Sequence, residues 1–188
     1  DWEALGGEDK FLPAAVNECG VGAIVWTTGL SYDAEKLTEA PTGWEDFWNT
    51  EEYPGKRGLR RGPKYSLEFA LMADGVPVEE VYEVLGTDEG VDRAFAKLDE
   101  IKGDIVWWEA GAQPIQLLAS GEVVMTTAYN GRLAGINKAE GTNFQIVWPG
   151  SIYAIDSWVV LKDSPNKDAA FEFINFASQP ENQAKLPE

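Results

Sequence analysis

Two residues of opposite charge, Arg132 and Asp156, are placed where the chain could recognise a small charged molecule. Arg132 follows the apolar segment 123–128 and should begin a helix directly after a strand, where a guanidinium can hold a carboxylate through two parallel hydrogen bonds. Asp156 interrupts the apolar segment 152–161, and a carboxylate there needs a protein partner or a ligand cation to offset its desolvation. From the residues alone, a solvent-facing Arg132 is favoured and a structural ion pair of Asp156 stays open.

Aromatic and acidic side chains follow the other predicted strands. Open α/β sheets bind ligands beyond the ends of their strands, and segments 107–113, 129–132 and 153–158 put polar groups there. Trp26, Trp108 and Tyr129 are candidate walls of a cleft, although each also suits a core. Glu109 with Asp156 could form a glycosidase-like pair, but among 32 acidic residues surface roles are favoured.

Composition removes several function classes. The 188 residues contain no histidine, which excludes most hydrolase templates, and a single cysteine, Cys19, which is expected to be packed. A formal charge of -17 argues against nucleic acid as a partner. Glycine spacing fits neither a phosphate loop nor a dinucleotide fold, so no cofactor is predicted, and without histidine or a second cysteine no metal site is predicted.

The elements that position these residues alternate between strand and helix. Strands are expected at 21–25, 104–108, 123–128, 144–148 and 152–161, and helices at 44–48, 64–74, 78–85, 91–102, 114–120, 133–139 and 169–176. The last helix should turn Phe171, Ile174 and Phe176 inward. The basic island 56–64 is interpreted as a solvated loop that pairs with carboxylates. The fold class is α/β.

Four segments together resemble the spermidine/putrescine-binding family of ABC-transporter solute-binding proteins. They are Val25-Trp26-Thr27-Thr28-Gly29-Leu30-Ser31-Tyr32-Asp33, Thr42-Gly43-Trp44-Glu45-Asp46-Phe47-Trp48, Leu118-Ala119-Ser120-Gly121-Glu122-Val123 and Asn166-Lys167-Asp168-Ala169-Ala170-Phe171-Glu172-Phe173-Ile174-Asn175-Phe176. The resemblance implies a type II periplasmic-binding-protein fold, present here incompletely as one full lobe, the hinge and part of the other lobe. Residues 1–28 would be the tail of lobe 1 leading to the hinge, 29–141 lobe 2, and 142–188 the return to lobe 1.

The resemblance also implies a function and partners. The protein would be a periplasmic receptor without enzymatic activity, which closes its lobes on a small solute and docks on a membrane permease. A missing N-terminal segment of the same protein, with its signal peptide, would complete lobe 1. An incomplete lobe also leaves open a third interpretation, a structural or interaction module.

One departure from the family pattern changes the expected ligand. Polyamine binders carry an acid at the position of Arg132, whereas their second ammonium-binding acid matches Asp156. A guanidinium with a retained carboxylate suits a zwitterion, so an ω-amino acid such as γ-aminobutyrate is predicted, with Tyr129, Trp26, Trp108 and Glu109 as further contacts. A putrescine or spermidine receptor is the alternative.

Overall fold

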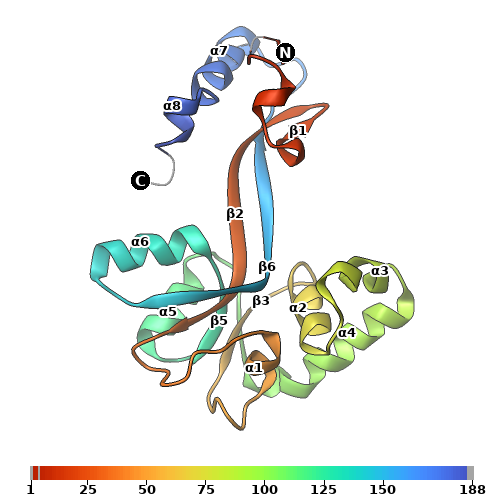
Figure 1. The fold of residues 1–188 in the computed structure, drawn as a ribbon, viewed down its shortest axis with the longest axis vertical. Coiled ribbons are helices and arrows are strands. Elements are labelled where there is room, and N and C mark those ends of the chain that lie inside the picture. Colours follow the sequence, from red (N-terminus) through yellow and green to blue (C-terminus); the bar gives the residue numbers. More distant parts are fainter. Residues whose placement is uncertain (1, 4, 186–188) are drawn as a thin grey trace. The chain divides into compact units, whose positions relative to one another are not determined.

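The chain forms two compact units in the computed structural model, which describes residues 2–3 and 5–185 (Figure 1). Unit 1 comprises Asp1–Trp26 and Tyr153–Glu188, and unit 2 comprises Thr27–Ile152. Two long strands, β2 (Gly20–Asp33) and β6 (Phe144–Trp158), contain the points of division and pair with each other. The expected α/β class is confirmed, whereas the assignment of 1–28, 29–141 and 142–188 to lobes stays a prediction.

The sheet brings the ends of three strands to one edge. Its order is β1-β2-β5-β3-β4, where β1 is Val16–Asn17, β3 Arg57–Arg60, β4 Ile105–Trp108 and β5 Met125–Tyr129. β3 runs parallel to both β4 and β5, while β2 runs antiparallel to β5 with Thr28 opposite Tyr129. The carboxyl ends of β3, β4 and β5 therefore lie at the same edge of unit 2, the edge where α/β sheets hold ligands.

The expected helices are present with shifted bounds. Unit 2 holds α1 (Trp44–Trp48), α2 (Ser66–Ala73), α3 (Val81–Leu85), α4 (Asp88–Ile101), α5 (Gln113–Ser120) and α6 (Asn130–Glu140), and unit 1 holds α7 (Lys167–Ala177) and α8 (Pro180–Gln183). Short 3-10 turns cover Glu8–Lys10, Pro13–Ala15, Val78–Glu80 and Lys102–Asp104. The hydroxyl of Thr87 caps α4 by accepting from the Gly90 N–H at 3.0 Å. Gly121 ends α5 in the left-handed conformation that glycine favours.

Unit 2 has a core on each side of its sheet elements. Trp44 stacks on Phe69 with ring centroids 3.8 Å apart, which joins α1 to α2. A second cluster packs α5 and α6 onto β5 and the start of β6; it consists of Ile115, Leu118, Val123, Ala128, Leu133 and Phe144. These two clusters fix the helices that follow β3, β4 and β5.

The interpretation of the basic island as a solvated loop is wrong for Arg57. Arg57 begins β3, an interior strand between β5 and β4, and is completely buried. Its guanidinium donates to the carbonyl oxygens of Phe47, Gly55 and Asn49 at 2.8, 2.7 and 3.0 Å. Burial lowers the pKa of Arg57, partly offset by the charge of Asp104. The strand was missed because it is four residues long and half of it is charged.

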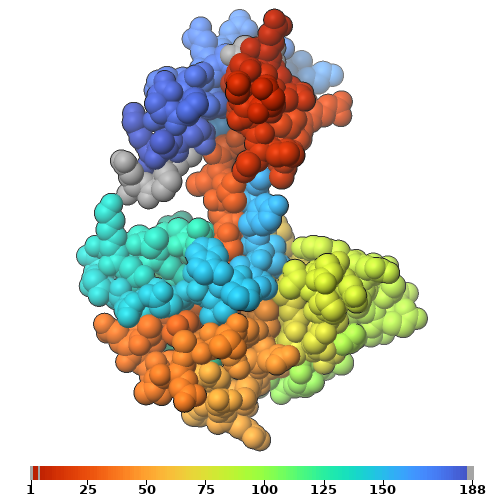
Figure 2. Space-filling model, viewed as in Figure 1, coloured from red at the N-terminus to blue at the C-terminus, as the bar shows by residue number. Residues whose placement is uncertain are grey.

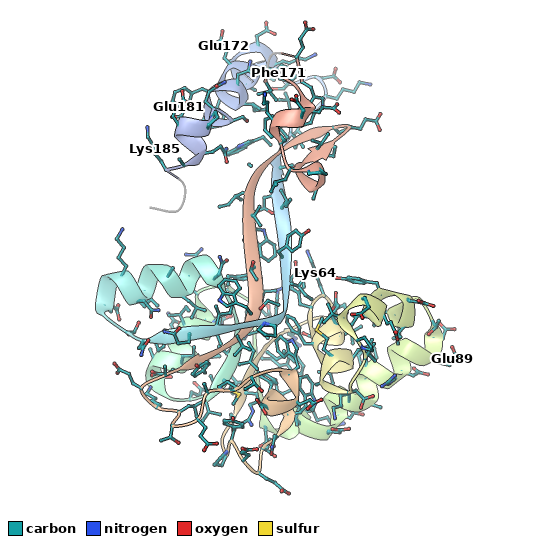
Figure 3. All side chains as sticks on the ribbon, in the orientation of Figure 1. Lys64, Glu89, Phe171, Glu172, Glu181 and Lys185 are labelled. Atoms are coloured by element: carbon teal, nitrogen blue, oxygen red, sulfur yellow. The ribbon has the colours of Figure 1, made fainter. Side chains whose placement is uncertain are left out.

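Three further expectations are corrected. Segments 144–148 and 152–158 belong to one strand, β6, which ends at Trp158 rather than at residue 161; it runs through Gly150, which has a left-handed φ of 70° and whose carbonyl accepts from Trp44 Nε1 at 2.9 Å. On α7, Ile174 is buried as expected, but Phe171 and Phe176 are exposed, and Phe171 projects from α7 in Figure 3. Cys19 is exposed rather than packed.

Membrane-spanning helices and metal-binding clusters are both absent from the described residues. None of their helices has the length and apolarity required to cross a bilayer. Nor does this part of the chain bring together three or more His, Cys, Asp or Glu residues suited to a metal ion.

Candidate ligand-binding site

The ends of β4 and β5 hold two of the candidate aromatic residues together. Trp108 ends β4, Tyr129 ends β5, and their rings meet edge to face with centroids 5.9 Å apart. Trp108 is 1% exposed, whereas Tyr129 is half-buried. Trp108 therefore packs against the Tyr129 ring in this structure, and a direct contact of Trp108 with a ligand stays a prediction.

In the turn after β4, hydrogen bonds to Gln113 order the backbone, and Arg61 pairs with the charge of Glu109. The amide oxygen of Gln113 accepts from the N–H groups of Glu109 and Ala110 at 2.8 and 2.7 Å, which fixes the turn into α5. The Glu109 carboxylate accepts a hydrogen bond at 3.1 Å from Nη1 of Arg61, the residue that follows the neighbouring strand β3. Glu109 is thus exposed and paired, and a ligand cation would have to compete with Arg61 for it.

Arg132 lies at the predicted junction of strand and helix. β5 ends at Tyr129 and α6 begins at Asn130, so Arg132 is in the first turn of α6. The Asn130 side chain accepts from the Thr27 N–H at 3.0 Å and so ties this turn to β2. Arg132 is exposed, and α6 forms part of the visible surface of unit 2 in Figure 2. Within the described residues the Arg132 guanidinium makes no ion pair.

Arg132 also lines a groove between α5 and α6. The groove walls are mostly small or apolar residues: Ala112, Ile115, Gln116, Ala119, Gly131, Gly135, Ile136, Ala139 and Glu140. Small side chains leave the guanidinium accessible from several directions. Arg132 can therefore donate hydrogen bonds to a ligand carboxylate without first breaking an ion pair with a described residue of unit 2.

Asp156 and Trp26 meet in unit 1. The indole Nε1 of Trp26 donates to the Asp156 Oδ1 at 3.0 Å, joining β2 to β6. Asp156 is exposed rather than buried, and over the described part of the chain it forms no salt bridge. The structural ion pair considered from the sequence is absent there, and the carboxylate keeps access to solvent.

The candidate residues thus form two groups. Trp108, Glu109, Tyr129 and Arg132 belong to unit 2, and Trp26 and Asp156 belong to unit 1. The unit 2 group offers an exposed cation and an aromatic pair, and the unit 1 group offers a carboxylate that accepts from an indole. These are the chemical groups that bind a carboxylate and an ammonium, respectively.

The turn between β3 and α2 belongs to the same edge and was missed as a candidate. Tyr65 is a buried non-glycine residue with a φ of 74°, a conformation that costs energy and is concentrated at functional sites. Lys64, seen before α2 in Figure 3, lies over the Tyr65 ring at 4.9 Å. A hydrogen bond with Tyr65 raises the pKa of Lys64, so this turn adds a persistent positive charge to the edge. Its signal in the sequence was the basic island 56–64, which ends at Lys64 and was interpreted as a solvated loop.

The family model described as bacterial extracellular solute-binding protein matches residues 4–188. The chain belongs to this family. It is 56% identical over 184 residues to the gamma-aminobutyric acid-binding protein of Pseudomonas aeruginosa, covering 98% of this chain and 52% of that protein. It is 27% identical over 176 residues to the spermidine/putrescine-binding periplasmic protein of Escherichia coli, covering 92% of this chain and 48% of that one.

A solved structure of a GABA receptor supports the fold. Its TM-score is 0.84 at 35% identity, over 98% of this chain and 56% of the receptor. The chain spans about half the length of the curated relatives it matches. The predicted solute-binding fold, present in part, is confirmed.

Proposed function

We propose that this chain is part of the receptor of an ABC importer that captures a small ω-amino acid such as γ-aminobutyrate. The observation that carries the proposal is the exposed guanidinium of Arg132 in the first turn of α6, which makes no ion pair among the described residues, together with the exposed carboxylate of Asp156 on β6. The 56% identity to a gamma-aminobutyric acid-binding protein supports the same choice of ligand.

Each charge has one role. Arg132 binds the ligand carboxylate through two N–H donors, and Tyr129 packs against the aliphatic part of the ligand. Asp156 accepts a hydrogen bond from the ligand ammonium. Because each charge of the ligand has its own partner side chain, high affinity requires both ends of one ligand to be bound, and a ligand with a single charge should bind weakly.

A polyamine receptor is the second candidate, favoured by the similarity to spermidine/putrescine-binding proteins. Putrescine carries an ammonium at each end, so one of them would meet Arg132 unless that side chain turned away. Glu109 is the acidic candidate residue at this edge, and Arg61 already pairs with it. The charges of the edge formed by β3, β4 and β5 therefore favour a carboxylate over a second ammonium.

The remaining features of the proposal follow from the family. The protein would act in the periplasm, bind without chemical turnover, and deliver its solute to a membrane permease. Its alternative use as a hydrolase through Glu109 and Asp156 is disfavoured by the pairing of Glu109 with Arg61.

A companion segment of the same polypeptide would complete unit 1. Ten of the fifteen exposed large apolar side chains among the described residues belong to this unit, which holds about a third of the chain. They are Leu12, Ile24, Val25, Tyr153, Trp158, Val159, Leu161, Phe171, Phe173 and Phe176. So dense an apolar surface is expected to be covered by further protein.

Isothermal titration calorimetry on the full-length protein tests the proposed ligand. We expect γ-aminobutyrate to bind in a one-to-one complex and putrescine to give no measurable heat. Butyrate and butylamine, which each carry one of the two charges, should bind at least about 100-fold more weakly. Binding of putrescine in preference to γ-aminobutyrate would replace this proposal with the polyamine receptor.

A further inference from the structure

A single hydrogen bond joins the two candidate residues of unit 1. Trp26 Nε1 donates to Asp156 Oδ1 at 3.0 Å, although the residues are 130 positions apart in the chain. Trp26 is on β2 and Asp156 on β6, which pair with each other. The bond is therefore held by the backbone of two paired strands and does not depend on a loop.

The bond divides the two oxygens of the carboxylate between two uses. An indole N–H can only donate a hydrogen bond, so Nε1 of Trp26 can only act as a donor to the carboxylate. Oδ1 accepts that donor, while Oδ2 has no hydrogen bond from any described residue. The carboxyl plane is thereby fixed with one oxygen satisfied by the protein and one available to a ligand.

We infer that Trp26 is a positioning residue, which holds Asp156 so that Oδ2 accepts a hydrogen bond from a ligand ammonium. The inference rests on the proposed function and changes the expected role of Trp26 from a wall of the cleft to a support for the acid. It also narrows the ligand class, because a hydrogen bond to Oδ2 requires an ammonium that carries at least one N–H.

The energetic reason is preorganisation. Asp156 is exposed, and without the indole its side chain would sample several rotamers in solvent. Binding would then have to order the carboxylate as well as the ligand. Trp26 already orders the carboxylate in the free protein. Loss of the indole donor should therefore weaken binding, although the negative charge of Asp156 remains.

Replacing one indole by a phenyl ring isolates this effect. Trp26→Phe in the full-length protein keeps an aromatic ring and loses the donor, and Trp158→Phe makes the same change two residues from Asp156 on β6. Trp158 is 41% exposed and packs edge to face on Phe173 at 5.3 Å. We expect Trp26→Phe to weaken γ-aminobutyrate binding about tenfold and Trp158→Phe to change it less than about twofold.

A double-variant cycle separates positioning from a direct contact. In an Asp156→Asn background, Trp26→Phe should cause no further loss, because the carboxylate that it orients is gone. An equal loss in both backgrounds would mean that Trp26 contacts the ligand itself and would overturn the inference. So would a Trp26→Phe variant that binds as tightly as the original protein.

The indole resonance of Trp26 gives a readout that needs no ligand. In the free protein, Asp156→Asn should shift the Trp26 indole ¹H–¹⁵N peak more than any other tryptophan indole peak, because its acceptor changes from a charged to a neutral oxygen. An unmoved peak contradicts the bond. Should the protein bind putrescine and not γ-aminobutyrate, the proposed ω-amino acid ligand fails. The Trp26→Phe comparison with putrescine still decides this inference, since both ligands carry a primary ammonium.

Discussion

The guanidinium of Arg61 and the carboxylate of Glu109 lie 3.1 Å apart and connect the end of β3 to the end of β4. Both side chains are largely exposed, so the pair adds little to stability. Its consequence is electrostatic: the one acidic candidate of unit 2 is neutralised, while Lys64 and Arg132 keep their charges. In a chain of net charge -17, this edge of unit 2 is therefore locally suited to an anionic group.

Reversing the charge of Arg132 should reverse the preferred ligand. Arg132→Gln is expected to weaken γ-aminobutyrate binding about 50-fold through loss of the charge-assisted hydrogen bonds, and Arg132→Glu should in addition create measurable putrescine binding. Calorimetry with both ligands provides the measurement. Lys102→Gln removes a positive charge whose partner is Asp99 and should leave both affinities unchanged. Undiminished γ-aminobutyrate binding by Arg132→Gln would remove Arg132 from the site.

Lysine should not substitute for Arg57. Its guanidinium donates to three main-chain carbonyls at 2.7 to 3.0 Å in a fully buried position, and an ammonium group cannot reach all three. Arg57→Lys is expected to lower the free energy of unfolding by about 3 kcal/mol, because buried acceptors lose their donors. Urea denaturation followed by circular dichroism measures this.

Arg60→Lys provides the matched control for Arg57. It is on the same strand and half-buried, and its main-chain carbonyl, not its side chain, accepts from Ser66 at 2.8 Å. We expect a loss below about 1 kcal/mol there. Equal losses at the two positions would mean that the three carbonyl contacts of Arg57 are not what stabilises β3.

Alkaline pH should destabilise the protein through Tyr82. Although Tyr82 is 65% exposed, partial desolvation of its hydroxyl raises its pKa, and the charge of Glu68 and a hydrogen bond to it act in the same direction. Since the unfolded side chain titrates near its ordinary pKa of about 10, stability is fully present below that pH and is lost as the pH rises through the folded pKa.

The measurement is the melting temperature between about pH 8.5 and 11. Tyr82→Phe should flatten the decline above about pH 10, and Glu68→Gln should flatten it partly because it removes the nearby negative charge. A decline that is the same in Tyr82→Phe and the original protein would assign the alkaline loss to other groups, among them Tyr53, whose pKa burial also raises.

The sequence located the candidate residues along the chain better than it located their partners. Apolar periodicity predicted α6 directly after β5, and Arg132 is in its first turn as expected. Local patterns could not reveal that Trp26 bonds Asp156, because that contact depends on the pairing of β2 with β6 over 130 positions. The pairing of Arg61 with Glu109 likewise required the parallel register of β3 and β4.

Two errors have the same physical origin. Arg57 was interpreted as solvated because charged residues are usually exposed, yet its buried guanidinium donates to three main-chain carbonyl oxygens. Phe171 and Phe176 were placed inside because aromatic residues usually are, yet unit 1 leaves them exposed. In both cases the average behaviour of a residue type was overridden by the partners that the fold does or does not supply.

A methyl group on Gly111 should disturb ligand binding through Tyr129. A Cβ built at this position would lie 3.2 Å from Cε2 of the Tyr129 ring, closer than ordinary van der Waals contact, so the ring must move by a few tenths of an ångström. The ring is exposed on one side and can yield, so we expect Gly111→Ala to change the free energy of unfolding by less than about 1 kcal/mol and to weaken γ-aminobutyrate binding about threefold. At Gly103 a Cβ meets nothing within 4 Å, and Gly103→Ala is therefore the control that should leave the affinity unchanged. Calorimetry on both variants decides the point: equal affinities would show that the position of the Tyr129 ring does not matter for the ligand, and Tyr129 would then leave the proposed site.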